Sequence, residues 1–244
     1  MRRFYAPPES FHEQSVRLSV EETRHLRNVL RLRAGETVNV FDGSGREFSC
    51  IIDTIGKHFS TLLIVNQISP PSPESDLDLT LAVALQKGEK VDLVVQKAVE
   101  LGVSKLQPLL ANRCDVGRGG GDKRTERWKK IALEAAKQSG RSKLMEVEAL
   151  LSFENFIKNL GPAAYESQKL ILFTEREGSG FSAIKPNKKI TAVFGPEGGW
   201  EDSELALARE HGFSLITLGG RILRAETAAI SVAAILQHRF GDMS

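Results

Sequence analysis

Residues 190–199 read ITAVFGPEGG, and residues 215–227 read LITLGGRILRAET. In each stretch a short apolar run of strand character leads into a glycine-rich turn, and a helical pattern follows the turn. Ligands of open α/β sheets bind at the carboxyl ends of the strands, where turns of this kind lie. Glycine also permits positive φ angles and a close approach of ligand to main chain. We therefore expect the turns at 195–199 and 219–227 to hold a nucleotide-like cofactor.

Strands and helices alternate through the second half of the chain. Such alternation predicts a mostly parallel sheet that is covered by helices. The last of the helices is apolar nearly all round, which indicates burial against the sheet or in an oligomer interface. We expect strands at residues 77–85, 105–110, 169–173, 190–194 and 213–218, and helices at 91–101, 127–139, 201–211 and 226–240.

The first 68 residues or so have a different, β-rich pattern. Short β-branched runs such as 37–41 and 61–65 are separated by tight turns, which predicts a small barrel or sandwich. The proline-rich, polar stretch 69–76 follows and has the composition of a linker. We therefore expect two domains, residues 1–70 and residues 71–244.

A short helix interrupts the β-rich part. Ser19 and Glu22 stand at the spacing of a capping box, with a serine at the N-cap and a glutamate three positions later. In the helix that follows, the spacing predicts that Leu26, Val29 and Leu30 share one face.

Composition excludes several classes of protein. No apolar run approaches the roughly 20 residues that cross a membrane, and the basic start of the chain lacks the apolar segment of a signal peptide. We expect a cytoplasmic protein in which Cys50 and Cys114 are reduced thiols. The five histidines are scattered, and no Cys/His cluster has the spacing of a metal site.

The net charge is only +2, but basic residues are concentrated in two zones. The chain up to Arg33 has seven arginines against four glutamates, and residues 113–143 have ten Lys/Arg against four acidic residues. Two basic zones on a nearly neutral chain suit a polyanion that is contacted at defined patches. They are equally compatible with solvated helix faces.

Known phosphate-binding and nucleophile motifs are missing. The sequence has no G-x-x-x-x-G-K-S/T loop, no dinucleotide-binding G-x-G-x-x-G after a strand, and no Ser or Cys at a nucleophile elbow. The two glycine-rich turns remain as candidates. Arg221, Arg224 and Glu226 stand at the edge of a buried region, where charges are costly unless they are paired or used. They form either a structural Arg224–Glu226 pair or part of a reactive site.

Residues 194–199 and 218–228, taken together, resemble the SPOUT methyltransferases, and more narrowly the RsmE family of ribosomal RNA uridine N3-methyltransferases. Residues 25–35, HLRNVLRLRAG, resemble the opening PUA-like domain of that family. One departure is Gly220, where some members carry proline. Blocks in the middle of the chain also match: residues 87–90, Lys97, residues 100–103, Arg113 and residues 138–141.

The resemblance implies a fold and a cofactor. The C-terminal domain is expected to be a SPOUT-like, trefoil-knotted, mostly parallel sheet, and the N-terminal domain a small PUA-like β-barrel that binds RNA. The implied cofactor is S-adenosylmethionine, held largely by main-chain groups of the two loops. The implied contacts are Leu172, Phe173, Thr174, Phe194, Gly195, Pro196, Glu197, Gly198, Leu218, Gly219, Ile222, Leu223 and Thr227.

The resemblance also implies a reaction, methyl transfer to N3 of a uridine in 16S ribosomal RNA without a metal. The site must then remove the N3 proton or stabilise the resulting anion. Arg224 is the first candidate, with Glu226 orienting it or taking the proton and Arg221 in a similar role. The expected partners are ribosomal RNA or the small ribosomal subunit and a second copy of the chain. Predicted phosphate contacts are Arg27, Arg31, Arg33, Lys87, Lys90, Arg113 and Arg141.

Two other functions remain open at this point. One is a SPOUT-like enzyme that acts on transfer RNA or on another atom, such as a ribose 2′-OH or guanine N1. The other is a non-catalytic RNA-binding or ribosome-assembly protein that has kept the fold. The intact loops at 195–199 and 221–226 argue against the second of these.

Overall fold

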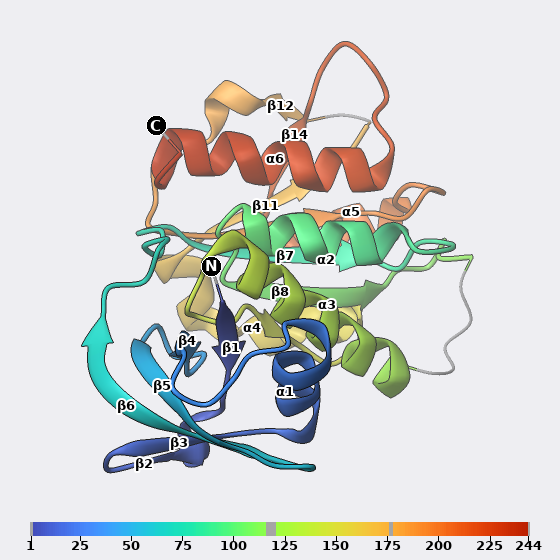
Figure 1. Cartoon of the computed structure of the whole chain (residues 1–244). Coiled ribbons are helices and arrows are strands. Elements are labelled where there is room, and N and C mark those ends of the chain that lie inside the picture. The colour runs from blue at the N-terminus through green and yellow to red at the C-terminus, as the bar shows by residue number, and fades with distance from the viewer. Residues whose placement is uncertain (1, 116–120, 176–177, 244) are drawn as a thin grey trace. The chain divides into compact units, whose positions relative to one another are not determined.

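The computed structural model describes residues 2–115, 121–175 and 178–243, with the backbone alone at residues 162–166 (Figure 1). The chain forms two compact units. The first comprises residues 1–74 and 136–144, and the second comprises residues 75–135 and 145–244. The predicted division into independent domains at residues 70 and 71 stays a prediction.

The first unit is built on a six-stranded, curled sheet. Strands β1 and β4 are parallel, and the other pairs are antiparallel. The buried face carries an apolar core that includes Phe4, Val40 and Leu62. The strands, in sheet order, are β1 (Arg3–Tyr5), β4 (Thr37–Phe41), β5 (Glu47–Ile55), β6 (Ser60–Ile68), β3 (Ser15–Leu18) and β2 (Phe11–His12).

Short helical turns connect these strands: a 3-10 turn η1 (Pro8–Ser10), α1 (Val20–Arg24) and a π-helical turn η2 (His25–Val29). The predicted N-cap is confirmed, because the Ser19 side chain accepts a hydrogen bond from the Glu22 amide at 3.2 Å. The predicted shared apolar face is wrong. Leu26 is buried, but the wider π turn rotates the following residues outward, and Val29 is 65% exposed.

A buried ion pair ties the segment 136–144 to the sheet of the first unit. Arg3 donates from Nε and Nη2 to the two carboxylate oxygens of Glu47 at 3.0 and 2.8 Å. The same guanidinium donates to the carbonyl oxygens of Ala136 and Arg141 and to Oγ of Ser142. Both charged side chains are almost fully buried, so the charges are compensated by protein groups such as these and not by bulk water.

The second unit contains an eight-stranded sheet in which every described pairing is parallel. This confirms the predicted parallel sheet. The two-residue strands β9, β10 and β12 are additional to the predicted strands. The main order is β10 (Leu151–Ser152), β8 (Lys105–Leu110), β7 (Asp78–Ala84), β13 (Lys189–Phe194), β11 (Lys169–Phe173), β14 (Ser214–Thr217) and β12 (Ser179–Gly180), with β9 (Glu146–Val147) beside β8.

Helices cover both faces of this sheet (Figure 1). Helices α2 (Lys90–Glu100) and α6 (Ala225–Phe240) pack together on one face, and α6 also contacts β7 and β13. On the other face α4 (Phe153–Ser167) and α5 (Asp202–Glu210) share an apolar core with the strands. The remaining helical segments are α3 (Gly121–Ser139) and the 3-10 turn η3 (Phe181–Ala183).

The path of the last third of the chain brings α6 back over strands that lie on the other side of β11 from β14. After β13 the chain crosses β11 to form β14, and α6 then returns over β13 and β7. The trefoil knot implied by the resemblance stays a prediction. Within the described residues, no helix has the length and apolar character needed to span a membrane.

The Arg3–Glu47 pair generates a prediction about stability. Glu47→Gln should lower the free energy of unfolding by about 3 kcal/mol, because it leaves a buried guanidinium without its carboxylate. Urea titration followed by circular dichroism would measure the loss. The control Glu36→Gln breaks the exposed Arg2–Glu36 pair and should change the midpoint very little. Equal effects of the two substitutions would contradict the prediction.

The pH dependence of unfolding provides a second measurement of how much the Arg3–Glu47 pair stabilises the fold. Burial alone would raise the pKa of Glu47, but hydrogen bonds from Arg3 and Ser142 outweigh it and lower the pKa below the ordinary value of 4.5. The stabilisation is therefore present above the unfolded-state pKa and is lost as the pH falls through the lower, folded-state value. The difference between wild type and Glu47→Gln should shrink below about pH 4.

Candidate functional site

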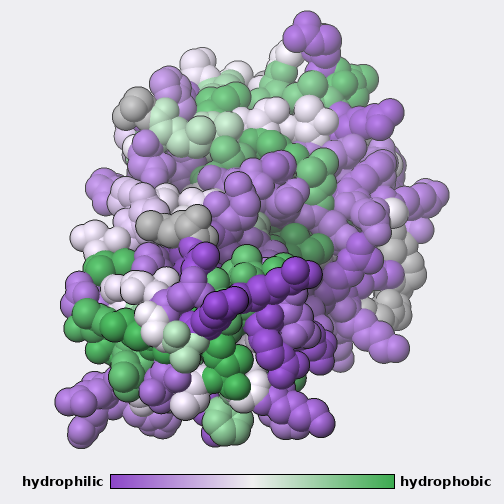
Figure 2. Space-filling view, in the orientation of Figure 1, coloured by the Kyte–Doolittle hydropathy of each residue, from purple (hydrophilic) through white to green (hydrophobic). Residues whose placement is uncertain are grey.

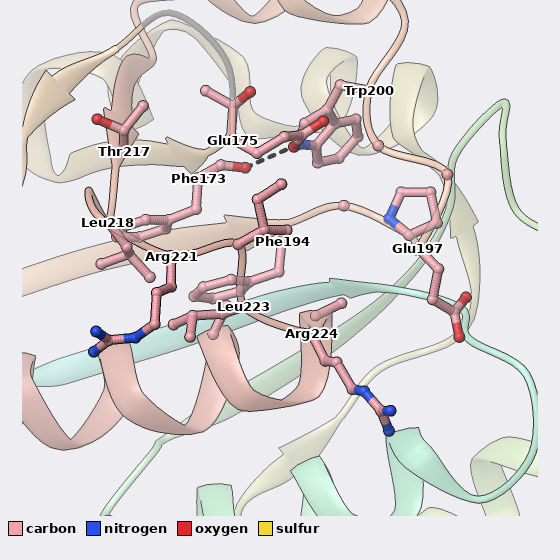
Figure 3. A pocket seen from close by; sticks show the side chains of 18 of the residues that line it. Phe173, Glu175, Phe194, Glu197, Trp200, Thr217, Leu218, Arg221, Leu223 and Arg224 are labelled. Carbon is pink, nitrogen blue, oxygen red and sulfur yellow. Dashed lines mark hydrogen bonds between the residues drawn. The ribbon is translucent and has the colours of Figure 1, made fainter.

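The candidate site is a cavity of about 600 Å³ in the second unit (Figure 3). Three neighbouring parallel strands, β13, β11 and β14, end at this cavity. Phe173 of β11 lies opposite Phe194 of β13 and Ile216 of β14, so the strands end at the same level. The turns that follow them converge on one cavity for this reason.

Most of the predicted cofactor contacts line this cavity. Leu172 and Thr227 are the two that do not: Leu172 is fully buried in the apolar core behind the wall, and Thr227 is exposed on α6. The predicted residues that line it are Phe173, Thr174, Phe194, Gly195, Pro196, Glu197, Gly198, Leu218, Gly219, Ile222 and Leu223. Lining residues that we did not predict as cofactor contacts or catalytic groups are Glu175, Gly199, Trp200, Thr217, Gly220, Ala225 and Ala228.

Of these additional residues, Glu175 could have been found from the sequence and Trp200 could not. Glu175 directly follows Thr174 at the end of the strand 169–173, so the rule that placed Thr174 at the site applies to it equally. Trp200 directly follows the glycine-rich turn. Its role depends on a contact with Phe173, 27 residues away, and periodicity carries no information about such contacts.

Trp200 anchors the loop 195–199 to the end of β11. Its Nε1 donates to the Phe173 carbonyl oxygen at 2.9 Å (Figure 3), and its ring centre lies 4.7 Å from that of Phe153 on α4. A Cβ atom at Gly195 would lie 2.9 Å from the indole ring. Glycine is therefore required at 195 because the main chain passes directly over the buried indole.

Two stacked aromatic side chains line one side of the cavity. The rings of Phe173 and Phe194 are parallel within 1°, with centroids 5.0 Å apart. Leu218 and Leu223 lie beside them in the view of Figure 3. An apolar lining edged by main-chain groups fits an adenine ring, and the volume is within the usual range for small-molecule sites. The cavity therefore fits an adenosine-containing cofactor.

Arg221 and Arg224 both line the cavity, but their side chains point away from each other (Figure 3). Arg224 is the N-cap residue of α6, so its cationic side chain adds to the positive end of the helix dipole. Glu226, in the first turn of α6, is only 9% exposed, and its Oε2 is buried with no hydrogen-bond partner among the described residues. No described Arg224–Glu226 ion pair forms, so the alternative of a structural pair is not supported.

The predicted RNA contacts are either exposed arginines of the first unit or basic side chains that already have partners within the protein. Arg27, Arg31 and Arg33 are exposed on the first unit, and Arg31 has an unusual φ of 52°. Lys87 pairs with Asp115 at 2.8 Å, and the hydrogen bond from that carboxylate raises the pKa of Lys87.

Lys90 and Arg113 contact the loop 195–199, through Glu197 and the Gly198 carbonyl oxygen. Arg141 does not match its predicted role. It is 4% exposed and bound to Glu74, so its guanidinium is not presented to solvent.

The two cysteines are not poised for nucleophilic chemistry. Burial raises the pKa of the Cys50 thiol to about 12. Burial also raises the pKa of the Cys114 thiol, whose Sγ lies 3.4 Å from the Leu85 carbonyl oxygen. Thiols with raised pKa values are poor nucleophiles at neutral pH, so the reactive candidates remain those at the cavity.

Comparison with known proteins identifies the family of both parts of the chain. The model of the RNA methyltransferase domain family matches residues 73–237, which is more than half of the chain. The model of the RNA methyltransferase PUA domain matches residues 18–65. The predicted PUA-like character of the first unit is thereby confirmed.

Individual relatives agree with the family models. Ribosomal RNA small subunit methyltransferase E of Synechocystis sp. is 34% identical over 230 residues, covering 93% of this chain and 74% of the relative. The protein of the same name from Rickettsia conorii is 33% identical over 220 residues, covering 88% and 86%.

Solved structures extend the agreement to the fold. The crystal structure of ribosomal RNA small subunit methyltransferase E from Neisseria gonorrhoeae, bound to S-adenosyl methionine, has a TM-score of 0.89 and 33% identity, and all of both chains is covered. A Legionella pneumophila methyltransferase in complex with the same cofactor has a TM-score of 0.87 and 33% identity, with 98% of each chain covered. The chain therefore belongs to the RsmE family of RNA methyltransferases.

Proposed function

We propose that this protein transfers a methyl group from S-adenosylmethionine to N3 of a uridine in small-subunit ribosomal RNA. The observation that carries the proposal is the cavity at the aligned ends of β11, β13 and β14, with two arginines at its rim. Relatives that are 33 to 34% identical are named as methyltransferases of that RNA, and the Neisseria neighbour was crystallised with this cofactor.

The cofactor supplies an electrophilic methyl group on a sulfonium, and the residues of the cavity hold and orient it. The rings of Phe173 and Phe194 provide the apolar surface for the adenine. The main chain of Gly195–Gly198 and Leu218–Gly219 provides polar groups at its edge. The Glu175 carboxylate, which also lines the cavity, is suited to the ribose hydroxyls or the ammonium group of the cofactor.

Uridine N3 carries a proton and becomes a good nucleophile only when that proton is removed. A cation placed over the developing negative charge lowers the cost of removal. Arg224 stands at the N-terminus of the 16-residue helix α6, so guanidinium and helix dipole act in the same direction. The buried Oε2 of Glu226 has no partner among the described residues, but Glu226 is not among the residues that line the cavity, so it would accept the proton only after the start of α6 has shifted toward the substrate. Arg221 lies elsewhere on the rim and is assigned a secondary role.

The reaction is tested with purified protein, S-adenosylmethionine and small-subunit ribosomal RNA lacking the modification. Nucleoside mass spectrometry should detect N3-methyluridine. Arg224→Ala should lower kcat by about a hundredfold to a thousandfold, because it removes the charge that stabilises the anion. The affinity for S-adenosylmethionine should stay nearly the same.

A matched arginine serves as the control for this substitution. Arg239 lies near the other end of α6, where its Nη1 donates to the Phe181 carbonyl oxygen, and Arg239→Ala should leave turnover unchanged. A 2′-O-methyl or N1-methylguanosine product would favour an enzyme with a different target. Cofactor-independent RNA binding with no methylated product would favour a non-catalytic protein.

We further propose that Arg27, Arg31 and Arg33 bind RNA phosphates. The three side chains are exposed and close together in the sequence: Arg27 lies in the π-helical turn η2, and Arg31 and Arg33 follow it. Replacing all three with alanine should reduce the slope of log K against log salt by about 2 to 3, since each lost phosphate contact removes about 0.7 to 0.9. Filter binding at several salt concentrations measures this. Lys158→Ala, which removes an exposed lysine on α4, is the control, and an unchanged slope in the triple variant would contradict the assignment.

We propose that the protein is a homodimer that associates through α6. Figure 2 shows hydrophobic surface over α6 and the loop before it. Ile235 on α6 is 39% exposed, Leu93 on the neighbouring helix α2 is 43% exposed, and Ile222 in the loop is 88% exposed. Exposed apolar side chains gathered on neighbouring elements are typical of association surfaces.

The dimer is tested by light scattering at micromolar concentration. Wild type should have twice the 26.9 kDa mass of one chain. Ile235→Glu should shift the mass toward one chain, because an unpaired charge would be buried at the interface. Val65→Glu changes a more exposed apolar residue on β6 of the first unit and should not change the mass. A monomeric wild type would contradict the proposal.

A further inference from the structure

The loop 195–199 is held from two neighbouring segments of the second unit. The first contact comes from the start of α2. Lys90 Nζ lies 2.7 Å from Oε1 of Glu197, and the two side chains are 34% and 36% exposed. The main chain of the same loop lines the cavity. The ion pair therefore restrains the middle of a loop whose backbone faces the cofactor site.

The second contact comes from Arg113, just after β8. Its Nη1 donates to the Gly198 carbonyl oxygen at 3.2 Å, and its Nε lies 3.9 Å from Oε1 of Glu201. The two backbones also touch, because a Cβ atom at Gly198 would lie 2.9 Å from the Arg113 Cβ and 3.1 Å from its carbonyl oxygen. Only glycine permits this approach.

Asn112 extends the same support to the start of α5. Its main-chain N–H donates to Glu204 Oε1, and its side-chain Nδ2 donates to Glu201 Oε2, both at 2.9 Å. Glu201 and Glu204 form the capping box that begins α5. Because α5 follows the loop directly, the segment 112–113 fixes the end of the loop while Lys90 fixes its middle.

We propose that Lys90 and Arg113 are positioning residues for the cofactor loop and raise the affinity for S-adenosylmethionine in the absence of RNA. The proposal rests on the proposed function, since it assigns the cavity to this cofactor. It differs from the phosphate contacts predicted for the two residues, because in this structure both cations are engaged by the loop. A loop that is already held in its bound conformation loses less conformational entropy when the cofactor binds.

The size of the effect follows from the kind of contact. The Lys90–Glu197 pair is partly exposed, and such pairs have modest strength, so Lys90→Ala should weaken cofactor binding about threefold. Arg113 makes a charge-assisted hydrogen bond to a main-chain carbonyl of the loop, which is a stronger contact. Arg113→Ala should weaken binding about tenfold.

The test is isothermal titration of S-adenosylmethionine into the full chain without RNA. Lys97→Ala is the matched control, because Lys97 is on the same helix and forms a 2.8 Å pair with Glu100, away from the loop. The dissociation constant of Lys97→Ala for S-adenosylmethionine should equal that of wild type. Thermal midpoints are measured in parallel to confirm folding. Arg113→Lys, which keeps the charge but not the guanidinium geometry, replaces the alanine variant if that variant does not fold.

A charge reversal separates positioning from general loss of stability. Lys90→Glu should weaken cofactor binding more than Lys90→Ala does, because it places a like charge beside Glu197, while the thermal midpoint stays close to that of wild type. Normal cofactor affinity in Lys90→Ala and Arg113→Ala, with weakened RNA binding, would overturn the proposal and leave the residues as phosphate contacts. If wild type itself does not bind S-adenosylmethionine, the proposed function fails instead.

Discussion

The candidate site depends on one hydrogen bond, from Trp200 Nε1 to the Phe173 carbonyl oxygen. It joins the end of β11 to the loop that follows β13, so two adjacent walls of the cavity are fixed to each other. The indole is buried against Phe153 of α4. Its N–H group therefore has no water molecule as an alternative hydrogen-bond partner. Gly195 accommodates the indole, and the glycine-rich character of this loop is explained as much by the protein's own packing as by a ligand.

Charges around the cavity are arranged by the same loops. The carboxylates of Glu175 and Glu197 and the guanidinium groups of Arg221 and Arg224 all lie on its lining. A cofactor that carries a sulfonium, an ammonium and a carboxylate is complementary to such a mixed set. Within α6, the cation at the N-cap and the buried carboxylate at Glu226 are separated. Arg224 lines the cavity and Glu226 does not, so the guanidinium is the one of the two charges that is presented to a ligand.

The sequence predicted the elements of the second unit well because each depends on local patterns. The apolar runs at 169–173 and 190–194 became β11 and β13, and the glycine turns after the strands marked the cavity. Helix α4 was missed because Gly161, with φ of 66°, interrupts its pattern. The burial of Arg141 and the exposure of Val29 were also beyond local reasoning. The first depends on Glu74, 67 residues away, and the second on a π turn that shifts the helical register.

The first unit combines two separate segments of the chain, and this affects how the chain folds during synthesis. Its sheet is made from the first 68 residues, yet the unit also includes residues 136–144. The Arg3 side chain is satisfied by carbonyl and hydroxyl groups of that later segment. A nascent chain that has emerged only to the linker thus exposes a charged pair that the finished protein buries. Contacts of such high sequence separation form slowly, so the first unit is completed only after much of the second has left the ribosome.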